Sequence, residues 1–429
     1  MSHSSIAWFR DTLLPQAEPP AGQTGVIHWL RARLFNGWWS SLLTVVALLV
    51  LFALVNAVLP WLANSVWQAD SLGECRRVLN GESGACWGVI RERWPQLLFG
   101  FYPQALYWRP LAAFVLLFVA LGPILFKRVP RGVLWFSAAY PGLAFWLVWG
   151  GSLWAPVLVY AGLALAMLCF SLARRFGIGV ALICAFGVAS AWWLHGMHVL
   201  LAFVDHQAPL QLVAVSSREL GGFLLSFVVG VSGIAMSLPL GILLALGRRS
   251  SMPLIRLISV TFIEFVRGVP LITLLFTASL LLNYFLPPGT SFDLILRVII
   301  MVTVFSTAYM AEVIRGGLAA LPQGQTEAAQ ALGLDYWKAQ RLVIMPQALK
   351  ISIPMIVSTF IGLFKDTTLV VFIGLLDPIA LSTAIRASTQ WQGIYWELFL
   401  FIGGVFFVFC FGMSRYSIYL ERRLKTDHR

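Results

Sequence analysis

The chain has 429 residues, of which 59% are hydrophobic and 11% are charged, and its mean hydropathy is +0.83. An ordinary soluble domain carries about 25% charged residues, so this composition excludes a soluble globular protein and indicates an integral membrane protein. The net charge of +12 could suit nucleic acid, but basic residues gathered on one side of a membrane protein produce the same excess. We therefore expect no nucleic-acid partner.

Ten apolar stretches are candidate transmembrane helices, since a bilayer core about 30 Å thick requires about 20 apolar residues per helix. Only Gly150, Gly151 and Ser152 separate the third from the fourth, so two full spans and one re-entrant hairpin both remain open there. The sequence predicts an all-α membrane protein with about ten helices. The stretches lie at about 38–63, 110–126, 132–149, 152–171, 178–200, 219–246, 254–285, 293–314, 351–376 and 394–415.

Charge orients the predicted bundle, because Lys and Arg favour the cytoplasmic ends of spans. With the N-terminus inside, the cytoplasmic segments hold twenty Lys and Arg, the outer segments seven and the spans three. Both termini are therefore predicted to be cytoplasmic. The cytoplasmic set includes Lys127, Arg128, Arg131, Arg174, Arg175, Arg248, Arg249, Arg422, Arg423 and Lys425.

Three parts are expected along the chain. Residues 1–37 form a polar cytoplasmic segment, and the apolar run after it is too long for a signal-peptide core of about 7 to 15 residues. Residues 38–205 form an extension of about five helices with an outer loop at about 64–109. Residues 206–429 form a five-helix core with a cytoplasmic loop at about 315–350. Function is expected in the core, because charged residues lie inside its spans.

Cys75 and Cys86 both fall in the outer loop, where an oxidising compartment would permit a disulfide. The bridged and the reduced states both remain open. His195 and His198 have i, i+3 spacing, but no carboxylate or Cys joins them on that helix face. We predict no metal site, no catalytic residue and no cofactor-binding residue.

The pattern E-x-x-R-G occurs twice, as Glu264 with Arg267 and as Glu312 with Arg315. Residues at i and i+3 share a helix face, so each pair can neutralise itself where an isolated charge would be costly. The pairs are either structural ion pairs or contacts that make the seventh and eighth spans move as a unit with the cytoplasmic loop.

The stretch EAAQALGLDYWKAQRLVIMPQ, residues 327–347, predicts two short helices in that loop. Leu321 and Pro322 begin the first helix and Gly333 ends it. Asp335 caps the second helix, which ends before Pro346.

These helices carry apolar side chains outside the bilayer, which pack against the chain's own bundle, lipid headgroups or another protein. Binding to headgroups would favour Lys and Arg, yet the only charge of the first helix is Glu327. A protein partner is therefore expected. The apolar residues are Ala328, Ala329, Ala331, Leu332, Leu334, Trp337 and Leu342.

The series Glu327-Ala328-Ala329, three residues, Gly333, nine residues, Val343, one residue, Met345-Pro346 resembles the EAA loop of permease subunits of bacterial ABC importers. The family has Ile and Leu where Val343 and Met345 stand. The flanks AYMAEVIRGGLAALPQGQ, LPLGILLALGRRS and FIEFVRGVPLI resemble the importers of histidine, glutamine, glutamate and arginine type. GACWGVIRERWPQLLFGFYP and TFIGLFKDTTLVVFIGL resemble one subunit of the general L-amino acid transporters of Gram-negative bacteria.

The resemblance implies a type I importer permease core in a bacterial inner membrane, with the EAA loop as coupling helices that dock into a groove of a cytoplasmic ATPase. Glu327 and Gly333 would orient and shape the loop, and Pro346 would end it. The implied partners are a related second permease, an ATPase dimer that binds ATP and Mg²⁺, and a periplasmic amino-acid-binding protein. The groove would be filled by Ala328, Ala329, Leu332 and Leu334.

The chain contains no G-x-x-x-x-G-K-[ST] phosphate loop and no Gly-Lys dipeptide. We therefore expect the ATPase to be a separate polypeptide and this chain to be no enzyme by itself.

Ionisable residues inside spans mark candidate transport pathways, because each costs at least about 2.5 to 3.5 kcal/mol at the bilayer centre. Lys365 and Asp366 follow Pro354 by 11 and 12 residues, which predicts a depth of roughly 16 to 18 Å, near the midplane. Alternatively, other spans neutralise them or they reach an interface. The further lining candidates are Glu264, Arg267, Thr303, Ser306, Thr307 and Thr367.

The main prediction is therefore a permease subunit of an ATP-driven amino-acid importer. A secondary transporter or channel would require ion-coupling sites or internal repeats, and the sequence shows neither. A purely structural protein would not explain the polar residues inside the spans.

Overall fold

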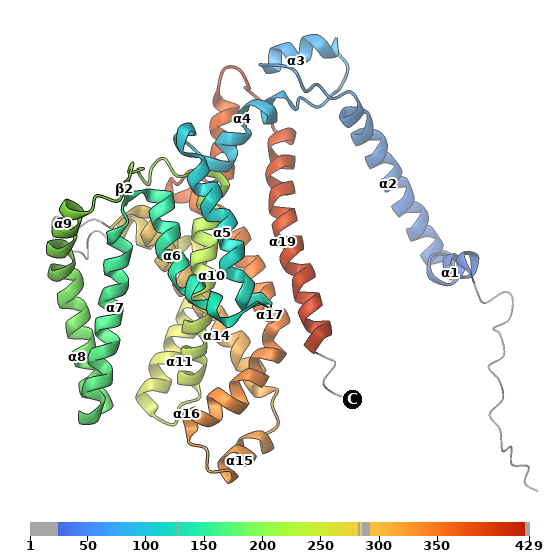
Figure 1. Cartoon of the computed structure of the whole chain (residues 1–429). Helices are drawn as coiled ribbons and strands as arrows, with labels where there is room; N and C mark the ends of the chain where they lie inside the picture. Colours follow the sequence, from blue (N-terminus) through green and yellow to red (C-terminus); the bar gives the residue numbers. More distant parts are fainter. Residues whose placement is uncertain (1–24, 127–128, 282–283, 285–291, 425–429) are drawn as a thin grey trace, which may run out of the picture. The chain divides into compact units, whose positions relative to one another are not determined.

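The computed structural model describes residues 25–126, 129–281, 284 and 292–424 and divides the chain into two compact units (Figure 1). The N-terminal unit comprises residues 1–69 and 73–88, and the main unit comprises 70–72 and 89–429. The described residues are mostly helical, which confirms the all-α membrane class. Residues 1–24 and the predicted cytoplasmic charges Lys127, Arg128 and Lys425 lie outside them.

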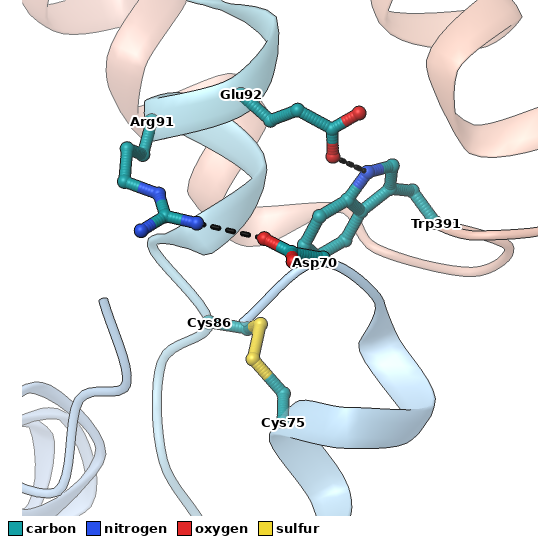
Figure 2. The surroundings of a disulfide bond; sticks show 6 residues. All are labelled: Asp70, Cys75, Cys86, Arg91, Glu92 and Trp391. Carbon is teal, nitrogen blue, oxygen red and sulfur yellow. Dashed lines mark hydrogen bonds and ion pairs between the residues drawn. A yellow bond between two sulfur atoms is a disulfide. The ribbon is translucent and has the colours of Figure 1, made fainter. Parts of the chain in front are cut away.

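In the N-terminal unit, α1 (Val26–Arg33) precedes α2 (Trp38–Ala63), which coincides with the first predicted span. Helix α2 is apolar on all sides and has no buried residue, as a lipid-facing helix requires. It leads to α3 (Leu72–Leu79), whose first residue belongs to the main unit. A disulfide joins Cys75 to Cys86 with Cα atoms 6.1 Å apart (Figure 2).

The extension continues in the main unit with six helices and one small sheet. The two strands are antiparallel, with Gly151 opposite Leu212. The elements are α4 (Gly88–Phe99), η1 (Gln104–Leu106), α5 (Trp108–Leu125), η2 (Arg131–Val133), α6 (Leu134–Trp149), β1 (Gly151–Ser152), α7 (Trp154–Ala173), η3 (Arg174–Phe176), α8 (Ile178–Ala191), η4 (Trp192–Gly196), α9 (Met197–Gln207) and β2 (Gln211–Leu212).

The core contains the long central helices α10 and α14, with α17 packed against both. Its elements are α10 (Gly222–Arg248), α11 (Pro253–Gly268), α12 (Leu271–Phe276), η5 (Thr277–Leu281), α14 (Leu294–Ala319), α15 (Gly324–Ala331), α16 (Tyr336–Ala339), η6 (Gln340–Ile344), α17 (Met345–Asp366), η7 (Thr367–Ile373), α18 (Pro378–Ala387) and α19 (Trp396–Leu424).

Each of the ten predicted stretches contains helix. Within the described residues, eight helices are long and apolar enough to cross a membrane. The seventh stretch is broken: α11 and the segment α12–η5 meet at 102°, at Val269 and Pro270, because proline cannot donate the hydrogen bond that would continue the helix. The third stretch is the 16-residue helix α6, which β1 separates from α7.

Glycines on α10 allow the core helices to approach one another closely. A Cβ atom on Gly233 would lie 2.9 Å from the side chain of Val302 on α14, and one on Gly230 would lie 3.0 Å from Phe364 on α17. Such distances are too short for larger side chains. The three helices therefore form a tight group, and the functional candidates lie at its two ends and along α14.

Candidate functional site

The first helix of the predicted loop, α15, begins at Gly324 with Gln323 as its N-cap, two residues later than predicted. It ends as predicted at Gly333, whose φ of +70° is a left-handed conformation that glycine adopts without strain. The N–H of Gly333 donates to the Gln330 carbonyl at 2.9 Å.

The second helix begins as predicted, because Asp335 Oδ1 accepts a hydrogen bond from the Lys338 N–H at 2.8 Å. The prediction that it ends before Pro346 is wrong. Helix α16 continues through the π-helical turn η6 into α17, so that Tyr336–Ile373 is one helical segment. Pro346 lies in the first turn of α17, where proline is tolerated, and the side chain of Gln347 donates to the Val343 carbonyl at 3.0 Å.

Several apolar side chains of this region are exposed, and we call Leu332, Tyr336, Trp337 and Leu342 the coupling surface. Leu332 is 79% exposed and Trp337 is 66% exposed. A cluster of exposed apolar side chains marks an interaction site. We therefore expect another molecule to bury this surface. Helices α15 and α16 lie at one end of the main unit, opposite α4 (Figure 1). We call these the coupling end and the outer end.

The other predicted coupling residues differ in exposure. Glu327, Ala328 and Pro346 are exposed and Leu334 is partly buried. Ala329 is only 2% exposed because it packs inside this chain. Its expected place in a partner's groove stays a prediction.

The two predicted acid–base pairs are joined into one network by a residue that the pattern did not indicate, Arg248 at the end of α10. Its guanidinium lies 2.8 Å from Glu264 Oε1 and 2.6 Å from Glu312 Oε1. Arg315 lies 2.9 Å from Glu312, while Arg267 lies 3.8 Å from Glu312 and 3.9 Å from Glu264. These five residues form the inner charge network, which connects α10, α11 and α14. No sequence pattern places Arg248 between the pairs.

Three predicted lining residues, Thr303, Ser306 and Thr307, lie on one face of α14 and are 4%, 2% and 3% exposed. Their hydroxyl groups have no hydrogen-bond partner among the described residues. A buried hydroxyl without a partner costs about 1 to 3 kcal/mol. These three residues, which we call the polar stripe, therefore lower the stability of this conformation. Polar groups that are retained despite such a cost are typical of functional residues.

The helix that carries Lys365 and Asp366 does not begin near Pro354 as the depth estimate assumed, because Pro354 lies inside α17. The two residues instead lie where α17 changes into the 3₁₀-helical segment η7. Lys365 is exposed and Asp366 is half-buried, while Thr367 is buried and donates to the Phe364 carbonyl at 2.8 Å. The polar patch thus coincides with a change of helix type.

At the outer end, a buried cation joins the extension to the beginning of the core. Arg109 is fully buried, and its Nε and Nη1 each donate at 2.8 Å, to the carbonyls of Leu147 and Val213 respectively. In the sequence, Arg109 lies at the end of the predicted outer loop at about 64–109. No signal could have shown its role, because its partners are main-chain atoms.

Helix α4 of the extension also holds the loop between α18 and α19. Trp391 is fully buried and its indole N–H donates to Glu92 at 2.8 Å (Figure 2). Arg93 donates to the Gln390 side chain at 2.9 Å. We call these four residues the outer clamp. Beside them, Arg91 forms an ion pair with Asp70 at 2.7 Å.

Asp377, which follows η7 and lies outside the spans, is fully buried at the same end. Its Oδ1 accepts the N–H of Ala380 at 2.8 Å and caps α18, whereas its Oδ2 has no partner among the described residues. Burial raises the pKa of this carboxyl group to about 6.

Residues 237–426 match the family described as binding-protein-dependent transport system inner membrane component. The chain is 56% identical to the glutamate/glutamine/aspartate/asparagine transport system permease protein BztC of Rhodobacter capsulatus, over 99% of this chain and 100% of that protein. It is 38% identical to the inner membrane amino-acid ABC transporter permease protein YhdY of Escherichia coli, over 93% of each. The glutamate/aspartate import permease protein GltK of Escherichia coli is 30% identical over 48% of this chain and 92% of that protein.

Proposed function

We propose that the coupling surface docks into a groove of the partner ATPase. The premise is that the chain belongs to the binding-protein-dependent transport system inner membrane components and is a permease subunit of an amino-acid ATP-binding cassette importer. The chain is a multi-pass protein of the inner membrane, and the family works with an ATPase and a substrate-binding protein. The observation that carries the proposal is the exposure of Leu332, Trp337 and Leu342, apolar side chains at the coupling end.

The continuous helix from α16 to α17 supplies the mechanical connection. From Tyr336 to Asp366 it is roughly 46 Å long at about 1.5 Å per residue, so a displacement of the coupling surface reaches Lys365 without crossing a loop. Helix α14 follows the same movement near the coupling end, because a Cβ on Gly317 would lie 2.6 Å from the Ala348 carbonyl of α17. ATP-driven movement of the partner would thereby tilt both helices.

The ATPase would bind ATP and Mg²⁺, since this chain lacks a phosphate loop. A second, homologous permease would complete the pathway. Both termini would be cytoplasmic. The Cys75–Cys86 bridge supports this orientation, because a disulfide persists in the oxidising periplasm and the basic segments remain on the other side.

The proposed substrates are acidic amino acids and their amides, in line with the substrates in the name of the 56% identical relative. The pathway would be lined by the polar stripe on α14, by Lys365, Asp366 and Thr367, and by Glu264 and Arg267 of the inner charge network. Three arginines face two glutamates in that network, so it has donors to offer a carboxylate.

Leu332→Glu tests the docking. The side chain is exposed, so the variant should fold normally, but its charge would have to be desolvated in an apolar groove. We expect co-purification of the ATPase to fall at least about tenfold, equivalent to about 1.4 kcal/mol, with a parallel loss of ATP-driven uptake in proteoliposomes. Gln330→Glu adds the same charge at another exposed position of α15 and is the control. Full ATPase binding and uptake by Leu332→Glu would overturn the proposal.

Lys365→Met tests the pathway separately. We expect uptake of acidic substrates to fall relative to uptake of their amides, while ATPase binding stays normal. Lys350→Met is the control at the other end of α17. Unchanged uptake of both substrate classes would remove Lys365 from the pathway.

A further inference from the structure

A large apolar cavity of about 580 Å³ lies between the extension and the core, entirely within the main unit. Helices α5 and α6 form one wall, and α10 and α19 form the other. Aromatic rings line the core side: Phe227 packs against Phe409 with ring centroids 4.7 Å apart. The small side chains of Ala120 and Ala144 leave the space open on the extension side.

The chemistry of the lining disfavours a charged ligand. No charged residue is among the lining residues, and only Ser137, Tyr140, Trp149 and Ser232 bring a polar side-chain group. The Tyr140 hydroxyl donates to the Ala113 carbonyl at 2.8 Å, the Ser137 hydroxyl donates to the Ala120 carbonyl at 2.6 Å, and the Trp149 indole donates to Ser217 at 2.8 Å. An amino-acid zwitterion would therefore lose its hydration without replacement, and water does not fill apolar cavities stably.

The cavity also matches a hydrocarbon chain in length and position. Along α5 it extends from Pro110 to Ile124, which corresponds to about 21 Å at about 1.5 Å per residue. Half of a bilayer core about 30 Å thick is about 15 Å, so a single acyl chain can lie along it. The lining residues Leu111, Ile124 and Met236 are 50%, 63% and 51% exposed, so the cavity opens laterally on a membrane-spanning surface.

The walls of the cavity need an apolar cover, because water does not fill an apolar space of this kind stably. Hydrocarbon is the apolar material that surrounds a membrane-spanning helix at this depth. We propose that the cavity binds an acyl chain of a bilayer phospholipid, which enters from the side and fills the space between the extension and the core.

Photocrosslinking of the complete transporter in vesicles tests this proposal. The probe is a phosphatidylethanolamine with a diazirine in the middle of one acyl chain. We expect crosslinks on the peptides that carry Ala144 and Phe227. Ala144→Phe should reduce them roughly tenfold, equivalent to about 1.4 kcal/mol. Ala139→Phe introduces the same side chain at an exposed residue of α6 outside the cavity and should leave them unchanged.

Two outcomes would overturn the proposal. One is labelling of the lining peptides that Ala144→Phe and Ala139→Phe leave equally strong. The other is crosslinking of the lining peptides to a protein chain instead of to the probe. Elution as a monodisperse complex verifies folding, and Ala120→Phe provides a second filling variant on α5. Because the test requires neither ATP nor substrate, its failure is distinguishable from failure of the coupling proposal.

Discussion

The two ends of the main unit are held together by different chemistry. At the coupling end, ion pairs connect α10, α11 and α14, and the exposed fraction of their side chains ranges from 16% for Glu312 to 52% for Glu264. At the outer end, fully buried groups such as Arg109 and Trp391 form hydrogen bonds to carbonyls and to a carboxylate of α4. The outer contacts also bring in the extension, whereas the inner charge network belongs to the core alone.

This difference suggests a division of labour. Exposed ion pairs contribute little stability and can exchange partners, which suits an end that moves with an ATPase. Buried hydrogen bonds to the main chain cannot be replaced without leaving polar groups unpaired, which suits an end that stays fixed. Substitutions at the outer end should therefore destabilise the fold. Substitutions at the coupling end should uncouple ATP hydrolysis from amino-acid uptake.

The largest effect is expected from Gly222→Ala. Gly222 has a φ of +61°, and a methyl group there would collide with the carbonyl of Leu97 on α4. Left-handed strain and overpacking each cost about 1 to 3 kcal/mol, so we expect little folded protein and a strongly lowered thermal unfolding midpoint in detergent. Gly403→Ala in α19 meets no atom within 4 Å and is the control. A normal midpoint for Gly222→Ala would show that α4 does not fix the core.

Arg109→Met should have the next largest effect. The substitution keeps an unbranched apolar side chain but leaves the carbonyls of Leu147 and Val213 without donors. The Leu147 carbonyl is buried and the Val213 carbonyl is partly buried, so we expect destabilisation of about 2 to 4 kcal/mol, measured by chemical unfolding in detergent. Arg218→Met removes an exposed arginine in the segment that follows Val213 and should change stability by less than about 0.5 kcal/mol. Equal stability of the two variants would contradict a fixed outer end.

The sequence predicts the helices well and the contacts of the outer end poorly. Each of the ten apolar stretches of membrane-spanning length contains helix. Gly333 ends a helix and Asp335 caps one, as their residue types predict. Pro346 misled the prediction, because a π-helical turn just before it changes which main-chain groups require partners.

Arg109 and Arg248 were missed for a different reason. Their partners lie far away in the sequence, and those of Arg109 are carbonyls, which every residue has. A pattern of side chains therefore cannot indicate them. Within the site, local residue types predicted where the first short helix of the loop ends and where the second begins, whereas the links between helices depend on the tertiary fold.

The free energy of unfolding should depend on pH through Asp377 at the outer end, and this distinguishes the outer end from the coupling end. The pKa of Asp377 is about 6 in the folded protein against 3.8 as its ordinary value, so the folded state favours the protonated form. The resulting stabilisation is complete below pH 3.8 and is lost as the pH rises through about 6. At about 1.4 kcal/mol per pKa unit, the loss is on the order of 3 kcal/mol.

Asp377→Asn should abolish that part of the pH dependence, because the amide oxygen still caps α18 but no group titrates. Chemical unfolding at pH 4 and pH 7 measures the difference between wild type and variant. Asp335→Asn is the matched control, since it changes an exposed cap at the coupling end. Identical pH profiles for Asp377→Asn and wild type would show that Asp377 does not titrate in this range.

The smallest effect on stability, and the most specific one on function, is expected from Glu312→Gln. Glu312 lies within 4 Å of Arg248, Arg267 and Arg315, so the variant leaves three guanidinium groups beside the single carboxylate of Glu264. The side chain of Glu312 is 16% exposed but its arginine partners are partly exposed, so we expect a loss of stability of about 1 to 2 kcal/mol and only a small fall of the thermal midpoint. The repulsion should instead separate α10 from α14 and raise ATP hydrolysis in the absence of substrate.

ATP hydrolysis per amino acid imported, measured in proteoliposomes, tests this expectation. Glu264→Gln is the control, because that carboxylate is more exposed and contacts only Arg248 closely, so its effect should be smaller. Adding Arg248→Gln to Glu312→Gln removes the surplus charge and should restore part of the coupling, and high salt should weaken the defect by screening the arginines. Two results would contradict a mobile coupling end. One is normal coupling in Glu312→Gln, and the other is a loss of stability as large as that of Arg109→Met.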